Sequence, residues 1–97
     1  MQLPLFHAIK VKLAPTKPIL INMNKEEFVK KLGNHLKELR IERGLTQAEI
    51  ASLMGKDRQS YQRVELGTTN PTVGYLIEIA KALQIPFTDL FLFYNEN

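Results

Sequence analysis

The sequence of 97 residues contains no cysteine. This absence excludes disulfide bonds, thiolate metal sites and cysteine nucleophiles, and it is consistent with a reducing compartment. The sequence also lacks an apolar run near the roughly 20 residues that a membrane-spanning helix needs, and its N-terminus does not have the pattern of a signal peptide. We therefore expect a single soluble, intracellular domain.

Residues suited to catalysis are equally scarce. The two histidines, His7 and His35, have no second histidine or carboxylate pair at metal-ligand spacing. The sequence contains neither a glycine-rich phosphate loop nor a nucleophile elbow. We therefore expect no enzymatic activity, no metal and no cofactor.

The net charge of +3 is weak evidence for a nucleic-acid partner because of where the charge lies. Lys10, Lys12 and Lys17 account for the whole excess, since residues 23–97 contain ten basic and ten acidic side chains. Attraction to a polyanion would have to come from a local cluster such as Lys56, Arg58 and Arg63.

The most informative stretch is residues 45–65, LTQAEIASLMGKDRQSYQRVE. Thr46 and Glu49 have the spacing of a capping box, which predicts a helix that begins near Gln47. Its apolar residues have helical spacing, and Gly55 is suited to end the helix in a left-handed conformation. The apolar residues are Ile50, Ala51, Leu53 and Met54.

A second helix is predicted after Asp57, which is suited to cap it. Tyr61 and Val64 are three residues apart and would face inward, which leaves an outer face of arginine and glutamine. Arginine pairs with the guanine edge and glutamine with the adenine edge in the major groove. Any solvated helix face can carry such residues, but the capping box, the glycine turn and the two apolar faces together favour a helix-turn-helix. The outer-face residues are Arg58, Gln59, Gln62 and Arg63.

Residues 32–91, in one gapless run, resemble the Cro and phage-repressor type of helix-turn-helix domain, the Xre family. The resemblance implies an all-α, five-helix, lambda-repressor-like fold in a prokaryotic cytoplasmic protein. It also implies a mostly dimeric, sequence-specific DNA-binding protein whose recognition helix is residues 58–65. A dimer would place two recognition helices roughly 34 Å apart on a palindromic operator.

The resemblance also implies roles for individual residues. Arg58, Gln59, Gln62 and Arg63 correspond to base-contacting positions, and Arg40 and Glu65 to a structural ion pair between the first helix and the recognition helix. The family usually has aliphatic residues where this chain has Lys56 and Tyr61, so we expect a more open turn and a tyrosine hydroxyl that reaches the DNA backbone. The expected DNA-backbone contacts are Gln47, Lys56, Ser60, Tyr61, Thr69 and Asn70.

Two further helices are predicted around this motif. Asn24 and Glu27 resemble a capping box at the start of a helix that ends at Gly44, and Gly33 within it indicates a bend or close packing. The apolar stripe of this first helix is Phe28, Leu32, Leu36 and Leu39. A later helix begins at Thr72, and its expected core residues are Val73, Leu76, Ile77, Ala80 and Leu83.

The C-terminal residues 85–94 form a short predicted helix with more aromatic surface than a small core can cover. Phe87, Leu90 and Phe91 would face inward, while three residues at the end would form a dimerisation surface, because homologues dimerise through this helix. In the alternative interpretation, these aromatics fold back against the N-terminal strands. The predicted dimerisation residues are Leu92, Phe93 and Tyr94.

Residues 1–22 differ in composition from the helical domain predicted over 23–97. Alternating apolar residues at Ile9, Val11 and Leu13 and a second run at 19–21 are compatible with a β-hairpin. Three interpretations remain: an arm that stabilises a dimer, a basic tail on DNA phosphates, or residues upstream of a natural start at Met23. The leading functional hypothesis is a dimeric transcriptional regulator of the repressor type. The alternative is an antitoxin or other protein-interaction module that regulates its own operon and binds a partner protein through residues 1–22.

Overall fold

The computed structural model describes residues 24–95, with side chains as far as Phe93, and contains five helices and no strand in this range. They are α3 (Lys25–Glu42), α4 (Gln47–Leu53), α5 (Arg58–Leu66), α6 (Val73–Leu83) and the 3-10 helix η2 (Phe87–Asn95). The predicted all-α, five-helix class is confirmed. The hairpin and the arm predicted for residues 1–22 lie outside the described range.

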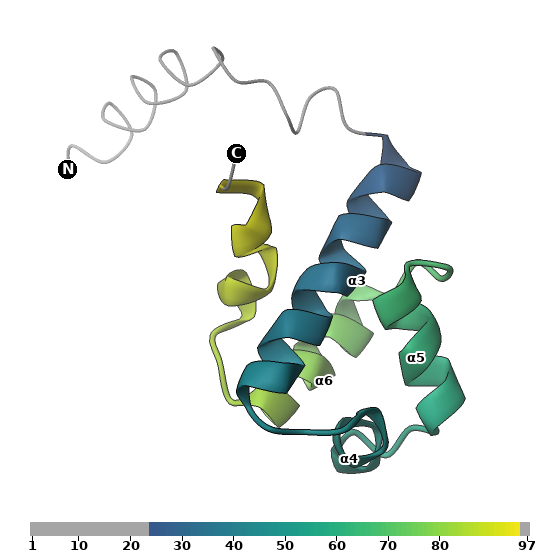
Figure 1. Cartoon of the computed structure of the whole chain (residues 1–97), viewed down its shortest axis with the longest axis vertical. Helices are drawn as coiled ribbons and strands as arrows, with labels where there is room; N and C mark the ends of the chain where they lie inside the picture. Colours follow the sequence, from purple (N-terminus) through teal and green to yellow (C-terminus); the bar gives the residue numbers. More distant parts are fainter. Residues whose placement is uncertain (1–23, 96–97) are drawn as a thin grey trace, which may run out of the picture.

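The helices surround one core (Figure 1). The long helix α3 runs between α5 on one side and η2 on the other, with α6 behind it. Helix α4, seen nearly end-on, lies at the bottom of the view beside the lower end of α5. The side chains most fully enclosed come from all five helices, so each helix contributes to the same core. They are Leu36, Ile50, Tyr61, Ile79, Leu83 and Leu90.

Local sequence signals set the helix starts. Both predicted capping boxes are present: the Asn24 side chain accepts from the Glu27 amide at 2.8 Å, and Thr46 accepts from the Glu49 amide at 3.0 Å. Each of these glutamates also accepts from the amide of its capping residue. Two donors are therefore satisfied at each helix start, and α3 and α4 begin where the sequence predicted.

Four predicted core residues are instead exposed. Val73 and Ile77 are 65% and 43% exposed, whereas Ile79, which was not predicted, is fully buried. Leu53 and Phe87 are also exposed. The residues that α6 buries are Leu76, Ile79, Ala80 and Leu83. This stripe has the same helical spacing as the predicted one but is rotated about the helix axis.

Two glycines allow α3 to lie directly against the end of α5. A Cβ atom on Gly33 would meet the carbonyl oxygens of Val64 and Glu65 at 2.5 Å, so the structure shows the close packing that was one of the two expectations for this residue. Gly67 ends α5 with a φ of +76°, and a Cβ there would lie 2.7 Å from the Lys30 Cα. These contacts fix the position of α5 relative to α3.

The helix η2 packs on the other side of α3. The ring of Phe93 lies 5.3 Å from that of Phe28 and 5.6 Å from that of His35, and the His35 Nε2 atom is 3.0 Å from the Asp89 carbonyl oxygen. Phe93 is therefore half-buried within the monomer. None of the described helices is both long and apolar enough to cross a membrane.

Candidate nucleic-acid interface

Helix α5 has one buried and one exposed face. Its N-cap Asp57 accepts from the Ser60 amide at 2.6 Å, and Tyr61 and Val64 face the core as predicted. The opposite face lies at the edge of the molecule (Figure 1). It carries the four predicted base-contacting residues, of which Gln62 is half-buried and Arg58, Gln59 and Arg63 are exposed.

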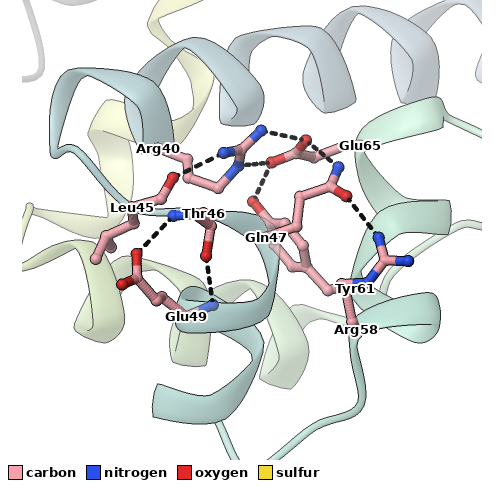
Figure 2. Close-up of polar contacts among 8 residues, drawn as sticks. All are labelled: Arg40, Leu45, Thr46, Gln47, Glu49, Arg58, Tyr61 and Glu65. Atoms are coloured by element: carbon pink, nitrogen blue, oxygen red, sulfur yellow. Dashed lines mark hydrogen bonds and ion pairs between the residues drawn. The ribbon is translucent and has the colours of Figure 1, made fainter.

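On the buried side of α5, an ion pair joins Arg40 of α3 to Glu65 of α5 (Figure 2). Arg40 donates from Nε to Glu65 Oε2 at 2.6 Å and from Nη2 to Oε1 at 3.1 Å. Its Nη1 atom donates to the Leu45 carbonyl oxygen at 2.7 Å, just before α4. The ion pair implied by the resemblance is thus present, and its arginine links α3, the start of α4 and α5.

Tyr61 is part of this buried network and is not a DNA contact. Its side chain is fully buried, and its hydroxyl donates to Glu65 Oε2 at 2.5 Å. The expectation that the hydroxyl reaches the DNA backbone is therefore wrong, because a buried carboxylate one turn along the same helix holds it. No buried side-chain polar atom in the described part of the chain is without a partner.

The network keeps its members in fixed protonation states. Burial alone would raise the pKa of Glu65, but hydrogen bonds from Arg40, Tyr61 and Gln47 outweigh this effect and hold it below its usual value. Burial, together with the hydrogen bond to Glu65, raises the pKa of Tyr61 far above its usual value. The hydrogen bond to Glu65 likewise raises the pKa of Arg40. Near neutral pH, the carboxylate is therefore ionised and every group facing it is a donor.

Gln47, the first residue of α4, connects this network to the exposed face of α5. Its Nε2 atom donates to Glu65 Oε1 at 2.9 Å, and its Oε1 atom accepts from Arg58 Nη1 at 3.4 Å. Figure 2 shows the resulting chain from Glu65 through Gln47 to Arg58. The Gln47 side chain, expected on a phosphate, is thus engaged by two protein groups.

The other predicted backbone contacts flank α5. Near its start, the Lys56 ammonium lies 3.7 Å from a carboxylate oxygen of Glu78 and 5.7 Å from the centre of the Tyr75 ring, whose hydroxyl is 3.3 Å from Ser60 Oγ. Beyond the other end of α5, Thr69 is half-buried and Asn70 is exposed.

The turn between α4 and α5 is closed by backbone hydrogen bonds despite the unusual lysine. The Gly55 amide donates to the Ser52 carbonyl oxygen at 3.0 Å, and the Lys56 amide donates to that of Ala51 at 2.9 Å. Gly55 adopts the left-handed conformation, with a φ of +70°. The Lys56 side chain lies beside α6, so it is accommodated without the more open turn that was expected.

Among residues 24–93, no three histidine, aspartate or glutamate side chains are grouped so that they could hold a metal ion. The arrangement offers hydrogen-bond donors and positive charge on a helix of nine residues, which suits binding to a nucleic acid.

Comparisons with known proteins agree with this geometry. The helix-turn-helix family model HTH_3 matches residues 36–90. The chain is 39% identical over 61 residues to the HTH-type transcriptional regulator y4dJ of Sinorhizobium fredii, which covers 63% of this chain and 79% of that protein. It is 33% identical over 58 residues to the cryptic phage CTXphi transcriptional repressor RstR of Vibrio cholerae, across 60% of this chain and 52% of the repressor.

Solved structures give the same result. The restriction-modification controller protein C.AhdI from Aeromonas hydrophila superposes with a TM-score of 0.69 and 35% identity, over 71% of this chain and the whole of that one. The clp gene regulator ClgR from C. glutamicum has a TM-score of 0.65 over 67% of this chain and 84% of its own, and at 22% identity it supports the fold alone. With the family model and the relatives in agreement, the chain belongs to the Xre-type helix-turn-helix family of DNA-binding transcriptional regulators.

Proposed function

We propose that the protein is a dimeric transcriptional repressor that recognises a specific double-stranded DNA sequence through α5. The observation that supports this proposal is the division of α5 into a face locked by the buried network and an opposite face of arginine and glutamine. Occupation of a promoter site by such a domain would block transcription. The promoter that the protein occupies would depend on which base edges the outer face of α5 recognises.

The dimensions of α5 suit the major groove. Nine residues form a helix about 13 Å long, comparable with the groove width of about 12 Å. At about 100° per residue, Arg58, Gln59, Gln62 and Arg63 span about 140° of the helix surface, so all four can face the base edges. Each bidentate contact from arginine to guanine or glutamine to adenine would contribute about 1–3 kcal/mol of discrimination.

Phosphate contacts on both sides of the groove would orient α5. We propose Lys56, Ser60 and the backbone amide of Gln47 near the start of α5, and Thr69 and Asn70 beyond its other end. Contacts of this kind add affinity without sequence preference. They also make binding strongly dependent on salt concentration.

Dimerisation is proposed through η2, centred on Leu92. This side chain is 46% exposed although it is apolar, whereas Phe93 already packs against Phe28 and His35 within the monomer. The side chain of Tyr94, the third predicted dimerisation residue, lies outside the described part of the structure. A two-fold dimer would place the two α5 helices roughly 34 Å apart and favour a palindromic operator.

The function is tested by binding-site selection from randomised duplexes, followed by titration of the selected and scrambled duplexes at one salt concentration. We expect the wild-type protein to prefer the selected duplex by at least about 1,000-fold. The variant Lys81→Ala, which removes an exposed positive charge from α6, should retain this preference. Equal affinity of the wild type for all duplexes would refute the proposal.

The dimer is tested separately by analytical ultracentrifugation of the wild type and Leu92→Asp. The variant should sediment as a monomer at micromolar concentration, because a charge would be buried at the two-fold interface. A wild type that is monomeric both in solution and on its selected duplex would refute the dimer and leave sequence recognition intact.

A further inference from the structure

We infer that Tyr75 of α6 binds the DNA backbone, in one phosphate site with Ser60 and Lys56, and that Glu78 competes with this phosphate for the Lys56 ammonium. The inference rests on the function proposed above and adds two residues to it. It assigns to α6, outside the two helices of the motif, a direct part in binding the DNA backbone.

The Ser60 side chain lies on one flank of α5. At about 100° per residue, its direction falls between those of Arg63 on the outer face and Val64 in the core. When the outer face enters the major groove, a flank of the helix faces the phosphates that line the groove. Ser60 is half-buried, and its Oγ atom lies 3.3 Å from the Tyr75 hydroxyl. Tyr75 therefore reaches the same flank from α6.

The two hydroxyls together provide a donor for a phosphate oxygen. Each hydroxyl carries one proton, and the hydrogen bond between Ser60 and Tyr75 uses only one of the two. The hydroxyl that accepts this bond can therefore donate its own proton to a phosphate, whose oxygens only accept. The Tyr75 ring is partly buried against the core, so its hydroxyl is held in place before DNA binds.

The same tyrosine lies beside a positive charge. The Lys56 ammonium is 5.7 Å from the centre of the Tyr75 ring, which is within the range of a cation–π contact. Serine, tyrosine and lysine side chains all bind phosphates in protein–DNA complexes. One non-bridging oxygen of a phosphate can accept from a hydroxyl while the other accepts from the ammonium. The three side chains thus suit a single phosphate group.

Glu78 places a negative charge next to this site. It lies one helical turn after Tyr75, and its Oε1 atom is 3.7 Å from the Lys56 ammonium. The Lys56 and Glu78 side chains are 39% and 46% exposed, and ion pairs in such positions are weak and exchange readily. A phosphate can therefore displace Glu78 from Lys56. The carboxylate that remains nearby repels the phosphate and lowers the affinity.

The test is a thermodynamic cycle between protein variants and individual phosphates. Methylphosphonates, which remove the charge and one acceptor oxygen of a phosphate, are introduced one at a time into the duplex obtained by binding-site selection. The affinities of the wild type, Tyr75→Phe, Lys56→Met and Glu78→Gln are measured on each duplex at several salt concentrations. Phenylalanine at position 75 keeps the ring that Lys56 contacts and removes only the hydroxyl.

We expect Tyr75→Phe and Lys56→Met to weaken binding to the selected and scrambled duplexes equally, each by about 5-fold, with unchanged base preferences. Both losses should disappear on the same modified duplex, in which the shared phosphate is neutralised. Glu78→Gln should strengthen binding to all unmodified duplexes by about 3-fold and steepen its dependence on salt. This gain should disappear on that modified duplex as well. An effect that acts through the fold would not be confined to one phosphate.

Two substitutions serve as matched controls. Tyr61→Phe removes a hydroxyl that is bound to Glu65 in the core, so its effect on affinity should be the same whichever phosphate is modified. Glu26→Gln makes the same change of charge as Glu78→Gln. It lies exposed in the first turn of α3, at the end of that helix far from the start of α5 (Figure 1), so the affinity should be nearly unchanged.

Three results would overturn the inference and leave the proposed function intact. The first is a loss in Tyr75→Phe that is equal on every modified duplex, and the second is an unchanged affinity of this variant. The third is a Glu78→Gln variant that binds no more tightly than the wild type. A wild type without sequence preference would yield no selected duplex and would overturn both the inference and the proposed function.

Discussion

Replacement of Tyr61 by phenylalanine tests the buried network directly, because it removes one hydroxyl and preserves the ring. The ring is fully buried, so the substitution leaves the packing in place and creates almost no cavity. The hydroxyl donates at 2.5 Å to an ionised carboxylate, and hydrogen bonds to charged groups contribute about 1.5–3 kcal/mol. We therefore expect the free energy of unfolding to fall by about 2 kcal/mol.

Urea unfolding, followed by circular dichroism at the helical minimum, measures this change. With a denaturant dependence of about 1 kcal/mol per molar urea for so small a domain, the midpoint should fall by about 2 M with an unchanged slope. Tyr75→Phe is the matched control, because its hydroxyl lies 3.3 Å from that of Ser60 in a partly buried, uncharged pair. Its loss should cost less than about 1 kcal/mol. Equal midpoints for the two variants would refute the reasoning, since the Tyr61 hydroxyl would then contribute no more than an ordinary one.

Three other predictions concern the support of α5 and its outer face. Because the pKa of Glu65 is lowered in the folded state from its ordinary value of about 4.5, its carboxylate stabilises the fold above that pH, and this stability is lost as the pH falls through the lower folded value. In Glu65→Gln, the urea midpoint should lose this part of its dependence on pH. Parallel curves of urea midpoint against pH for the variant and the wild type would contradict the prediction. Gly33→Ala should destabilise the domain by about 1–3 kcal/mol, because its methyl group meets two α5 carbonyl oxygens at 2.5 Å. Gly74→Ala, where the methyl group has room, is the control in the same thermal melt, and equal melting temperatures would argue against the steric explanation. Arg63→Ala should weaken binding to the selected duplex by about 1–3 kcal/mol and relax one base position. Equal losses on selected and random duplexes would remove Arg63 from the base-contacting set.

The features that could be predicted from the sequence are those set by neighbouring residues. The capping boxes at Asn24 and Thr46 bring together groups three residues apart, so spacing alone identifies them. The left-handed glycine at position 55 and the inward direction of Tyr61 likewise follow from local pattern. These signals were sufficient to position the candidate recognition helix.

The remaining features depend on contacts between distant segments. In α6, the stripe that begins at Val73 and the stripe that begins at Leu76 both have helical spacing, and only packing against α4 and η2 determines that Ile79 is buried and Ile77 exposed. The hydroxyl of Tyr61 was misassigned for the same reason, because its acceptor is oriented by Arg40, which is 21 positions earlier in the sequence.

The direct contact of α3 with the end of α5 has a consequence for altering this protein. At Gly33 the backbone of α3 lies against two backbone carbonyl oxygens of α5, and Gly67 at the end of α5 lies against the Cα atom and side chain of Lys30. We therefore expect the angle of α5 to be insensitive to substitutions on its solvent side. On the proposed function, we therefore expect that the four outward residues can be exchanged as a group to create regulators for other operators. The two glycines, by contrast, should be left unaltered in any such redesign.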